Sequence, residues 1–474
     1  MAHIVSGNRN GKILVHAGFR YQRNKTRLGA LYWKCWRGDC PSRLRTTVFN
    51  VNAVNPNIQI QNVTNHNHQV DDAVVNRNII LDEMKVEIQR DPTVPIRRVY
   101  DLVLRRMQQR GVVNIQIPAY NSVRSILNRA RNEDMPPIPR NIRQVQIHGN
   151  WALTWANDLY ILHQDNVNGV IVFATDADLV LLDQAECVYV DGTFRSAPRP
   201  YIQFFTIHGR VNAYVLKLVC GLLIDKQAPS YELVFRTIDA RIQLMLGHQW
   251  NPPQIVTDFE GGIISALRNV FPGRPIRGCY FHFAKAVWSH VQELGLVPVF
   301  NNNPDVMMII KKLMAIGFVP LNLIRMNYGL LRNGQNVPAL IALFPQLQVF
   351  FTYFENTWVN ANSHFPPILW NVYQRPMEFR TNNAVESFNR VWNAAVGVRH
   401  PSLWLFIRVL KDKQAAHEAT KQNMINGVPP PPRRRKWRQL EAHINRLQTQ
   451  YRNGQRTVDN YWRAVCYTLN RFYQ

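Results

Sequence analysis

The hydrophobic residues of this 474-residue chain recur with different periods in different segments. In residues 18–45, aromatic and aliphatic positions alternate with basic ones, which favours a β-rich segment. Residues 82–89, 96–109 and 121–131 instead have the helical period, and prolines separate them. The pattern predicts a small β-rich unit followed by three short helices. These helices are either a helix-turn-helix-like DNA contact or a packed linker with a basic face.

Residues 151–295 alternate short apolar runs with helical periods, which is typical of a mixed α/β fold. Three consecutive strands are followed by a helix, a strand, a helix and a strand, which is the order of an RNase H-like core. In such a core the ends of the first and fourth strands lie side by side. We expect these strands at residues 187–191, 201–208, 214–224, 254–258 and 276–279, with an earlier strand at 170–174.

The remaining residues are mostly helical by their spacing. Residues 296–365 have Leu, Ile, Met and Phe at helical intervals and predict an all-α insertion, whose aromatic stretch 344–358 fits either a core or stacking on a flipped base. Residues 428–438, VPPPPRRRKWR, predict a stiff basic spacer. Two amphipathic helices follow it, and they either mediate self-association or pack back on the core. The predicted multidomain α/β organisation is 1–70, β-rich; 71–150, helical; 151–295, first part of the core; 296–365, all-α insertion; 366–425, core completion; and 426–474, basic linker and C-terminal helices.

Three carboxylates stand out in these segments. Asp191 ends the apolar strand in CVYVDGTF, and Asp258 ends the one in QIVTDFE. Because an unpaired buried charge is costly, Asp191 needs a partner, which is either a metal ion or a local group such as Arg195. Glu386 lies one turn into the helix of RTNNAVESFNR, where the alternative is a capping box with Asn383. Two strand aspartates and a helix glutamate in this order are together a more specific signal than any one of them, and carboxylate oxygens are ligands that hard cations such as Mg²⁺ or Mn²⁺ prefer.

The composition points to a polyanionic partner. Lys and Arg total 56 against 31 Asp and Glu, which gives a net charge of +25. Nucleic acid is the first choice of partner and an anionic membrane surface the second. Six cysteines do not form the disulfide framework of a secreted protein, and no apolar leader segment begins the chain. The longest apolar run, 213–224, is interrupted by Lys217 and is too short to span a bilayer. We therefore expect a soluble, intracellular protein without a membrane partner.

The β-rich segment contains candidate zinc ligands. Cys35 and Cys40 are followed, 25 residues after the second cysteine, by His66 and His68. Two cysteines and two histidines complete a tetrahedral zinc site, and a His-x-His pair on a strand points both rings to one face. The alternative is two ordinary buried cysteines and two surface histidines.

This segment resembles the FLYWCH zinc finger. The residues that match the letters of the family name are Phe19, Leu31, Tyr32, Trp33, Cys35 and the closing histidine. The loop between the two cysteines is shorter than in many members. The resemblance implies a small β-rich fold that binds DNA, with phosphate contacts from basic residues that include Lys34, Arg37, Arg43 and Arg45.

The segments VDGTF, TDFE, CYFH and TNNAVESFNR together resemble the transposase core of Mutator-like elements, a DDE family. The resemblance puts Asp191, Asp258 and Glu386 on the family's catalytic positions. Cys279 and His282 match its Cys-x-x-His signature, for which we expect a structural or DNA-positioning role near the site. Asn389 stands where some relatives have a histidine.

The resemblance implies a cut-and-paste transposase that binds double-stranded DNA at transposon ends and at the target, and that catalyses metal-dependent cleavage and strand transfer. Lys285 and Arg390 are expected to contact phosphates. We expect a homo-dimer or higher oligomer in the nucleus, where the basic cluster 433–436 fits an import signal. The alternative is a domesticated transposase that acts as a DNA-binding regulator and does not need its nuclease.

Overall fold

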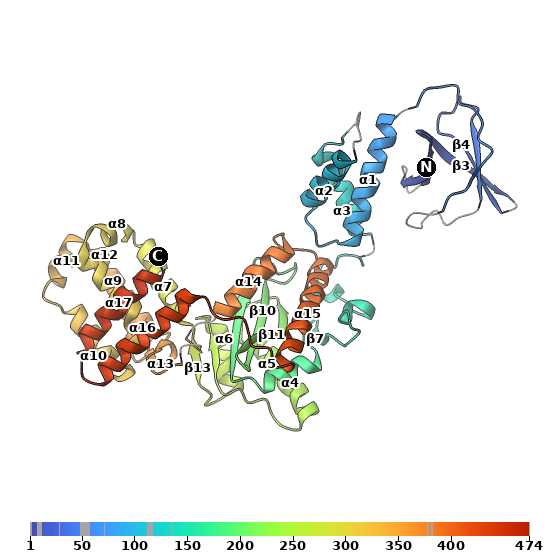
Figure 1. Cartoon of the computed structure of the whole chain (residues 1–474). Coiled ribbons are helices and arrows are strands. Elements are labelled where there is room, and N and C mark those ends of the chain that lie inside the picture. Colours follow the sequence, from blue (N-terminus) through green and yellow to red (C-terminus); the bar gives the residue numbers. More distant parts are fainter. Residues whose placement is uncertain are drawn as a thin grey trace. The chain divides into compact units, whose positions relative to one another are not determined.

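The computed structural model describes residues 2–6, 12–27, 29–47, 57–70, 72–110, 117–133, 135–376, 379–380 and 383–473. The chain divides into two compact units, Met1–Ile138 and Pro139–Gln474 (Figure 1). The six segments predicted from the sequence are a finer division, and they stay a prediction.

The first unit begins with an antiparallel sheet whose strands follow one another in chain order. Side chains alternate across the sheet, so Leu31 and Trp33 face the core while Tyr32 and Lys34 face the other side. Tyr21 and Leu44 complete this small core. The strands are β1 (Ala2–Ser6), β2 (Lys12–His16), β3 (Phe19–Arg27), β4 (Ala30–Cys35), β5 (Arg43–Thr47) and β6 (Ile60–Gln61).

Three helices complete the first unit: α1 (Asp72–Arg90), α2 (Ile96–Gln109) and α3 (Tyr120–Arg131). They share a core that includes Met84, Val103 and Leu127, and α1 packs on the sheet where Ile79 meets Ile13. The predicted boundaries of α2 are confirmed, whereas α1 begins ten residues before the predicted start at 82. Asparagines among those residues weaken the helical signal there because Asn has a low helix propensity.

The second unit is built on a mixed sheet with the strand order β13-β12-β9-β10-β11-β8-β7. Strands β9, β10 and β11 are antiparallel neighbours, while β12 runs parallel to β9 and β13 parallel to β12. The predicted strands are all found, and β7 is an additional one whose half-buried residues ILHQD lack a clear alternation. The strands are β7 (Ile161–Asp165), β8 (Val170–Phe173), β9 (Cys187–Thr193), β10 (Gln203–Val211), β11 (Tyr214–Leu223), β12 (Ile255–Thr257) and β13 (Ile276–Gly278).

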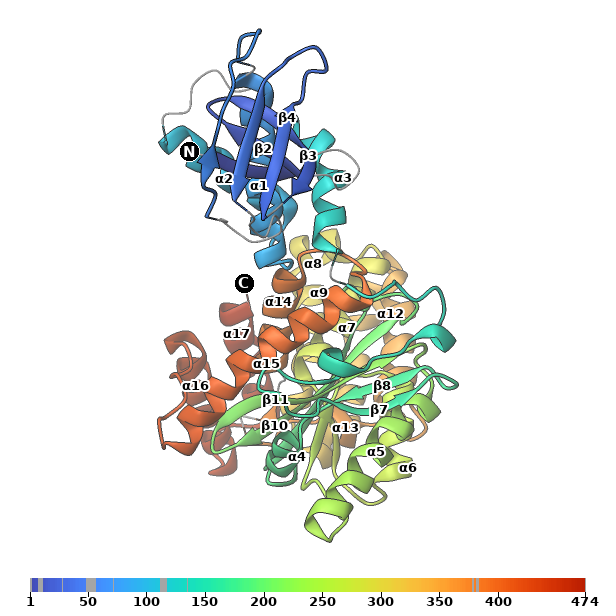
Figure 2. The same cartoon turned by 90° about the vertical axis from the view of Figure 1, so that its right-hand side faces the viewer.

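Helices cover both faces of this sheet (Figures 1 and 2). On one face α4 (Asp176–Asp183), α5 (Ala228–Leu246) and α6 (Gly261–Val270) bury Leu179, Phe235 and Leu267 against the strands. On the other face lie α14 (Asn383–Val396) and α15 (Leu403–Ile425), where Trp392 and Phe406 pack on Phe204. This double coverage explains why β9 and β11 are continuous apolar runs rather than alternating ones.

A helical region with its own hydrophobic core forms the remainder of the second unit. Helices α16 and α17 pack into this core against α9, so the C-terminal helices belong to the helical region in this structure. Phe350, Phe351 and Trp358 are buried there, which confirms the core interpretation of the aromatic stretch. Within the described residues, no helix is long and apolar enough to cross a membrane. The helices are α7 (Tyr280–Glu293), α8 (Val297–Asn302), α9 (Pro304–Ala315), α10 (Ile324–Arg332), α11 (Val337–Leu343), α12 (Gln346–Phe354), α13 (Pro367–Trp370), α16 (Arg435–Arg452) and α17 (Val458–Tyr473).

Candidate functional site

The two strand aspartates meet at neighbouring strand ends. Strand β12 runs beside β9 in a register that pairs Thr257 with Val190. Asp258 and Asp191 are the next residues of the two strands, so the parallel register places them side by side. Asp191 is only 4% exposed, and α14 and α7 lie over this edge of the sheet through the small cluster of Val385 and Cys279.

The pKa values of both aspartates are raised. Burial, followed by the charge of Asp258, raises the pKa of Asp191 to about 7. Burial also raises the pKa of Asp258. Two adjacent buried carboxylates favour a proton or a metal ion between them, because desolvation and like charge both disfavour the ionised pair.

Glu386 reaches this site from α14, and its nearest partner is a histidine. The Nε2 atom of His282, on α7, lies 3.0 Å from Oε1 of Glu386. This hydrogen bond lowers the pKa of Glu386. Burial alone would lower the pKa of His282, but its bonds to Cys279 and Glu386 outweigh burial and raise it to about 10. His282 of the Cys-x-x-His pair therefore contacts the glutamate, and Cys279 bonds to His282.

Asn389 is a site residue whose role the sequence left open. Its Nδ2 atom donates to Oδ2 of Asp191 over 2.5 Å, from a position one turn after Glu386 on α14. In the described part of the chain this amide, and not Arg195, is the side-chain partner of Asp191. Thr381, Asn382 and the side chain of Asn383 lie outside the described residues, so the capping-box alternative stays open.

A hydrogen-bonded group behind the aspartates was not predicted. The hydroxyl of Tyr231 contacts the carboxylate of Glu260 and lies 2.5 Å from Oε1 of Gln203. Gln203 leaves no room for a side chain at residue 192, because a Cβ on Gly192 would lie 2.0 Å from its Nε2. Burial raises the pKa values of both Tyr231 and Glu260. The glutamate at the end of TDFE was the one sequence signal for this group.

The four predicted zinc ligands come together in the first unit. Their ligand atoms lie within 4.8 Å of one another, and among the described residues they are the one such group of His, Cys, Asp or Glu. Cys35 Sγ lies 3.2 Å from His68 Nε2, and Cys40 Sγ lies 3.4 Å from His66 Nδ1. These separations are near the edges of about 3.3–3.8 Å expected for a tetrahedron of sulfur and nitrogen around zinc. The set therefore fits zinc, bound through Nδ1 of His66 and Nε2 of His68.

The other nitrogen of each histidine has an oxygen partner. Nε2 of His66 lies 2.7 Å from the hydroxyl of Tyr21 and 3.1 Å from that of Ser42. Nδ1 of His68 lies 2.8 Å from the carbonyl of Gln69. Such partners fix the tautomer and ring orientation that a bound metal requires. The ring of Phe19 also stacks on His66, with ring centroids 3.5 Å apart.

Comparison with known proteins finds a matching family for a segment of each unit. Residues 187–286 match the MULE transposase domain, and residues 4–68 match the FLYWCH zinc finger domain. Two segments of the chain are thus similar to known families, the FLYWCH zinc finger domain and the MULE transposase domain. The family resemblance predicted from the sequence is confirmed for these segments. Asp191, Asp258, Cys279 and His282 lie inside the MULE match, whereas Glu386 lies beyond its end.

Two further comparisons add little. No curated protein sequence matches the chain. The Drosophila P element transposase strand transfer complex is a similar solved structure, with 11% sequence identity over 86% of this chain and 93% of that chain. Its TM-score of 0.22 does not establish a shared fold.

The FLYWCH domain has a basic face opposite its core. The antiparallel register places Lys25 and Arg45 on either side of Tyr32, with their charged groups 5.4 Å and 5.7 Å from the ring centroid. The same register pairs Lys34 with Arg43 on this face. Two cations at the ring of Tyr32 and two more on the same face form a surface that complements a phosphate backbone.

The other predicted DNA contacts are exposed. Arg37 lies in the turn between the two zinc cysteines. In the second unit, Lys285 on α7 and Arg390 on α14 are exposed, and the charges of both lower the pKa of Glu386. These two cations therefore lie near the glutamate, where an incoming phosphate would meet them.

Proposed function

We propose that this protein is a MULE-type DNA transposase that binds transposon ends as double-stranded DNA and catalyses metal-dependent cleavage and strand transfer. Asp191, Asp258 and Glu386 are the proposed catalytic residues. The observation that carries the proposal is the register of β12 on β9, which puts Asp258 beside Asp191 within the segment that matches the MULE domain.

We further infer that the catalytic core is RNase H-like. Its support is the strand order β11-β10-β9-β12-β13, in which three antiparallel strands are followed by two strands parallel to the first. Strands β8 and β7 extend this arrangement at the β11 edge.

The residues at the strand ends fit Mg²⁺ or Mn²⁺. Carboxylate oxygens are the ligands that these hard cations prefer, and the raised pKa values of the two aspartates mark a pair in need of a cation. When bound, such ions activate an attacking hydroxyl and stabilise the leaving oxygen in phosphoryl transfer. In this chain Asn389 orients Asp191, and His282 orients Glu386.

The proposed partners follow from charge. A net charge of +25 and the basic face around Tyr32 suit duplex DNA, whose binding is then steeply salt-dependent. We propose that the protein acts in the nucleus as a homo-dimer or higher oligomer, because cut-and-paste transposition joins two transposon ends.

Cleavage of DNA that contains the inverted repeats flanking the gene tests the function. The full chain is expected to cleave such DNA with Mg²⁺, and Glu386→Gln is expected to bind it without cleaving. A wild-type protein that binds the repeats but does not cleave with Mg²⁺ or Mn²⁺ would favour the domesticated regulator. A protein that binds no DNA would overturn both functions.

A further inference from the structure

A cavity of about 530 Å³ lies in the helical region of the second unit, lined by residues of α7, α8, α9 and α17. Figure 1 labels these four helices. This volume is within the range of roughly 300–1,000 Å³ found for small-molecule sites. The proposed cleavage reaction does not itself use this cavity.

The walls of the cavity are largely aromatic. Phe281 and Trp288 come from α7 and Phe300 from α8, and all three are half-buried. Trp288 and Phe300 meet edge to face, with centroids 5.0 Å apart and an interplanar angle of 74°. Cys466 of α17 also lines the cavity and is 2% exposed. Such walls suit a flat ring, because aromatic faces and edges both attract one.

The charged groups of the cavity are two lysines. Lys285 is exposed on α7, and Lys311 lies on α9 with its Nζ 5.7 Å from the ring centroid of Phe300. Among the described residues, neither lysine forms an ion pair, and the cavity lining includes no acidic side chain. An occupant that combines a flat ring with a negative charge would match both features.

The cavity adjoins the carboxylate site through one helix. Lys285 lies one turn after His282 on α7, and His282 holds Glu386 at 3.0 Å. The charge of Lys285 acts on Glu386 directly, since it contributes to the lowered pKa of that carboxyl. A phosphate held by Lys285 would therefore lie between the cavity and the catalytic carboxylates.

We propose that this cavity binds one nucleotide of an unpaired DNA strand, with the base against Trp288 and Phe300 and the phosphate on Lys285 and Lys311. The proposal rests on the proposed transposase function. It assigns to the helical region the capture of a base that has left the duplex beside the cleaved phosphate. A free nucleotide has the same ring and phosphate chemistry, so the two sources are separated by experiment.

The test compares two DNA ligands that differ only in their bases. One is a duplex with a short single-stranded oligothymidine extension, and the other has the same extension made of abasic nucleotides. Binding to the full chain is measured in Ca²⁺, so that cleavage does not interfere. The wild type is expected to prefer the base-bearing extension by about 5- to 150-fold, because stacking of a base on aromatic side chains has that strength.

Variants test whether the preference for the base-bearing extension comes from this cavity. Trp288→Ala is expected to abolish it, and Trp288→Phe to retain part of it. The matched control is Trp155→Ala, which removes an exposed tryptophan of the same unit that is no part of the cavity. Lys311→Gln is expected to weaken binding of both ligands and to reduce the salt slope by about one.

Photocrosslinking of a thio-thymidine extension to the wild-type chain adds a readout that needs no variant. Crosslinks in α7 or α8 are expected, and crosslinks confined to other elements would contradict the proposal. Equal wild-type affinity for both ligands would also overturn it, as would tighter binding of free dTMP than of the extension. Loss of self-association in Trp288→Ala with unchanged DNA preference would assign the cavity to a second copy instead. A chain that cleaves DNA without a base preference disproves this inference alone, whereas a chain that binds no DNA disproves the proposed function.

Discussion

Two buried aspartates of the second unit have opposite electrostatic surroundings. Asp191 is accompanied by another carboxylate and by one amide, and its pKa is raised to about 7 by burial and by Asp258. Asp178 is fully buried at the start of α4, where burial alone would raise its pKa as well. The hydrogen bond with His417 and the charges of Lys217 and Lys421 instead hold its pKa well below the usual range.

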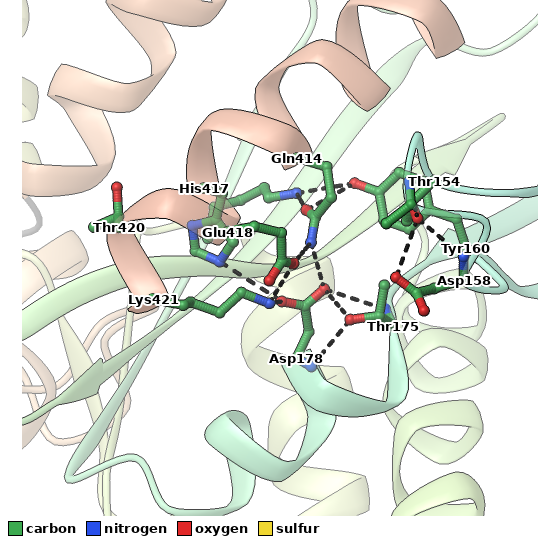
Figure 3. Close-up of polar contacts among 12 residues, drawn as sticks. Thr154, Asp158, Tyr160, Thr175, Asp178, Gln414, His417, Glu418, Thr420 and Lys421 are labelled. Carbon is green, nitrogen blue, oxygen red and sulfur yellow. Dashed lines mark hydrogen bonds and ion pairs between the residues drawn. The ribbon is translucent and has the colours of Figure 1, made fainter. Parts of the chain in front are cut away.

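The partners of Asp178 come from distant parts of the chain (Figure 3). Lys421 Nζ lies 2.8 Å from Oδ1, and Gln414 Nε2 lies 3.0 Å from Oδ2. The hydroxyl of Thr175 donates over 2.8 Å within a capping box. Lys217 supports this cluster from β11 through its 3.0 Å contact with Gln414 Oε1.

This difference in surroundings distinguishes Asp178, a structural carboxylate, from Asp191, which is suited to bind a metal. Protein cations neutralise Asp178 permanently, so it ties α15 to α4 and has no capacity for another cation. The charge of His282 partly offsets the raised pKa values of Asp191 and Asp258, but among the described residues neither aspartate forms an ion pair with a protein cation. An external divalent ion is then the partner that their burial requires.

Asp191→Asn is expected to have the largest effect. It removes a charge that the proposed reaction needs, so Mg²⁺-dependent DNA cleavage should fall by at least ~10³-fold. The melting temperature should stay the same or rise, because the repulsion from Asp258 disappears. Cleavage and thermal unfolding of the same preparations measure both effects. Normal cleavage by this variant would contradict the assignment of Asp191 as a carboxylate that binds a metal.

Asp178→Asn should have the opposite profile. It removes the anion beside Lys217 and leaves Lys421 with only the exposed Glu418, and breaking a buried pair in this way costs about 3–5 kcal/mol of stability. Chemical denaturation measures the loss, while cleavage per folded molecule should remain. Unchanged stability would show that the lysines find other partners.

Asn389→Lys would give Asp191 a protein cation as a partner, as Asp178 already has. An ammonium beside Asp191 should occupy the place of an external cation and reduce Mg²⁺-dependent cleavage at least ~100-fold, as loss of one charge-stabilising contact does. Ala394→Lys adds the same charge at an exposed position of α14 and is the control. Equal activity of the two lysine variants would contradict our account.

The smallest effect concerns His208, which burial and the charges of Lys217 and His417 hold at a pKa of about 3. Because this pKa is below the ordinary 6.5, its contribution to stability is present above pH 6.5 and is lost as the pH falls toward 3. Wild-type stability should therefore drop by roughly 2 kcal/mol more than that of His208→Gln between pH 6.5 and 5. Denaturant titrations at these pH values measure the difference, and parallel curves for the two proteins would contradict the prediction.

Much of the molecule could be predicted because its signals are local. The strands ending at Asp191 and Asp258 are short apolar runs, and such runs indicate burial on both faces. The zinc ligands were predictable from residue type and spacing, and α2 and α5 from their helical period. Each of these patterns reflects geometry within a single element.

The partners of those residues were decided by the tertiary structure. The register of β12 on β9, the contact of His282 with Glu386 and the bond from Asn389 to Asp191 each join segments far apart in the chain. Local periodicity contains no record of such pairings, because they depend on how complete elements pack.

Lys217 illustrates the limit most clearly. The sequence presents it as an interruption of an apolar run, which was used to exclude a membrane span. The fold buries it at 4% exposure against Tyr160 and Gln414, beside the carboxylate of Asp178. Sequence alone predicted the burial of the apolar strands and the chemistry of the aspartates at their ends. Only the packing of α4, β11 and α15 decided that one buried aspartate is neutralised while the other remains available to a metal, because that depends on which charges the fold brings within contact.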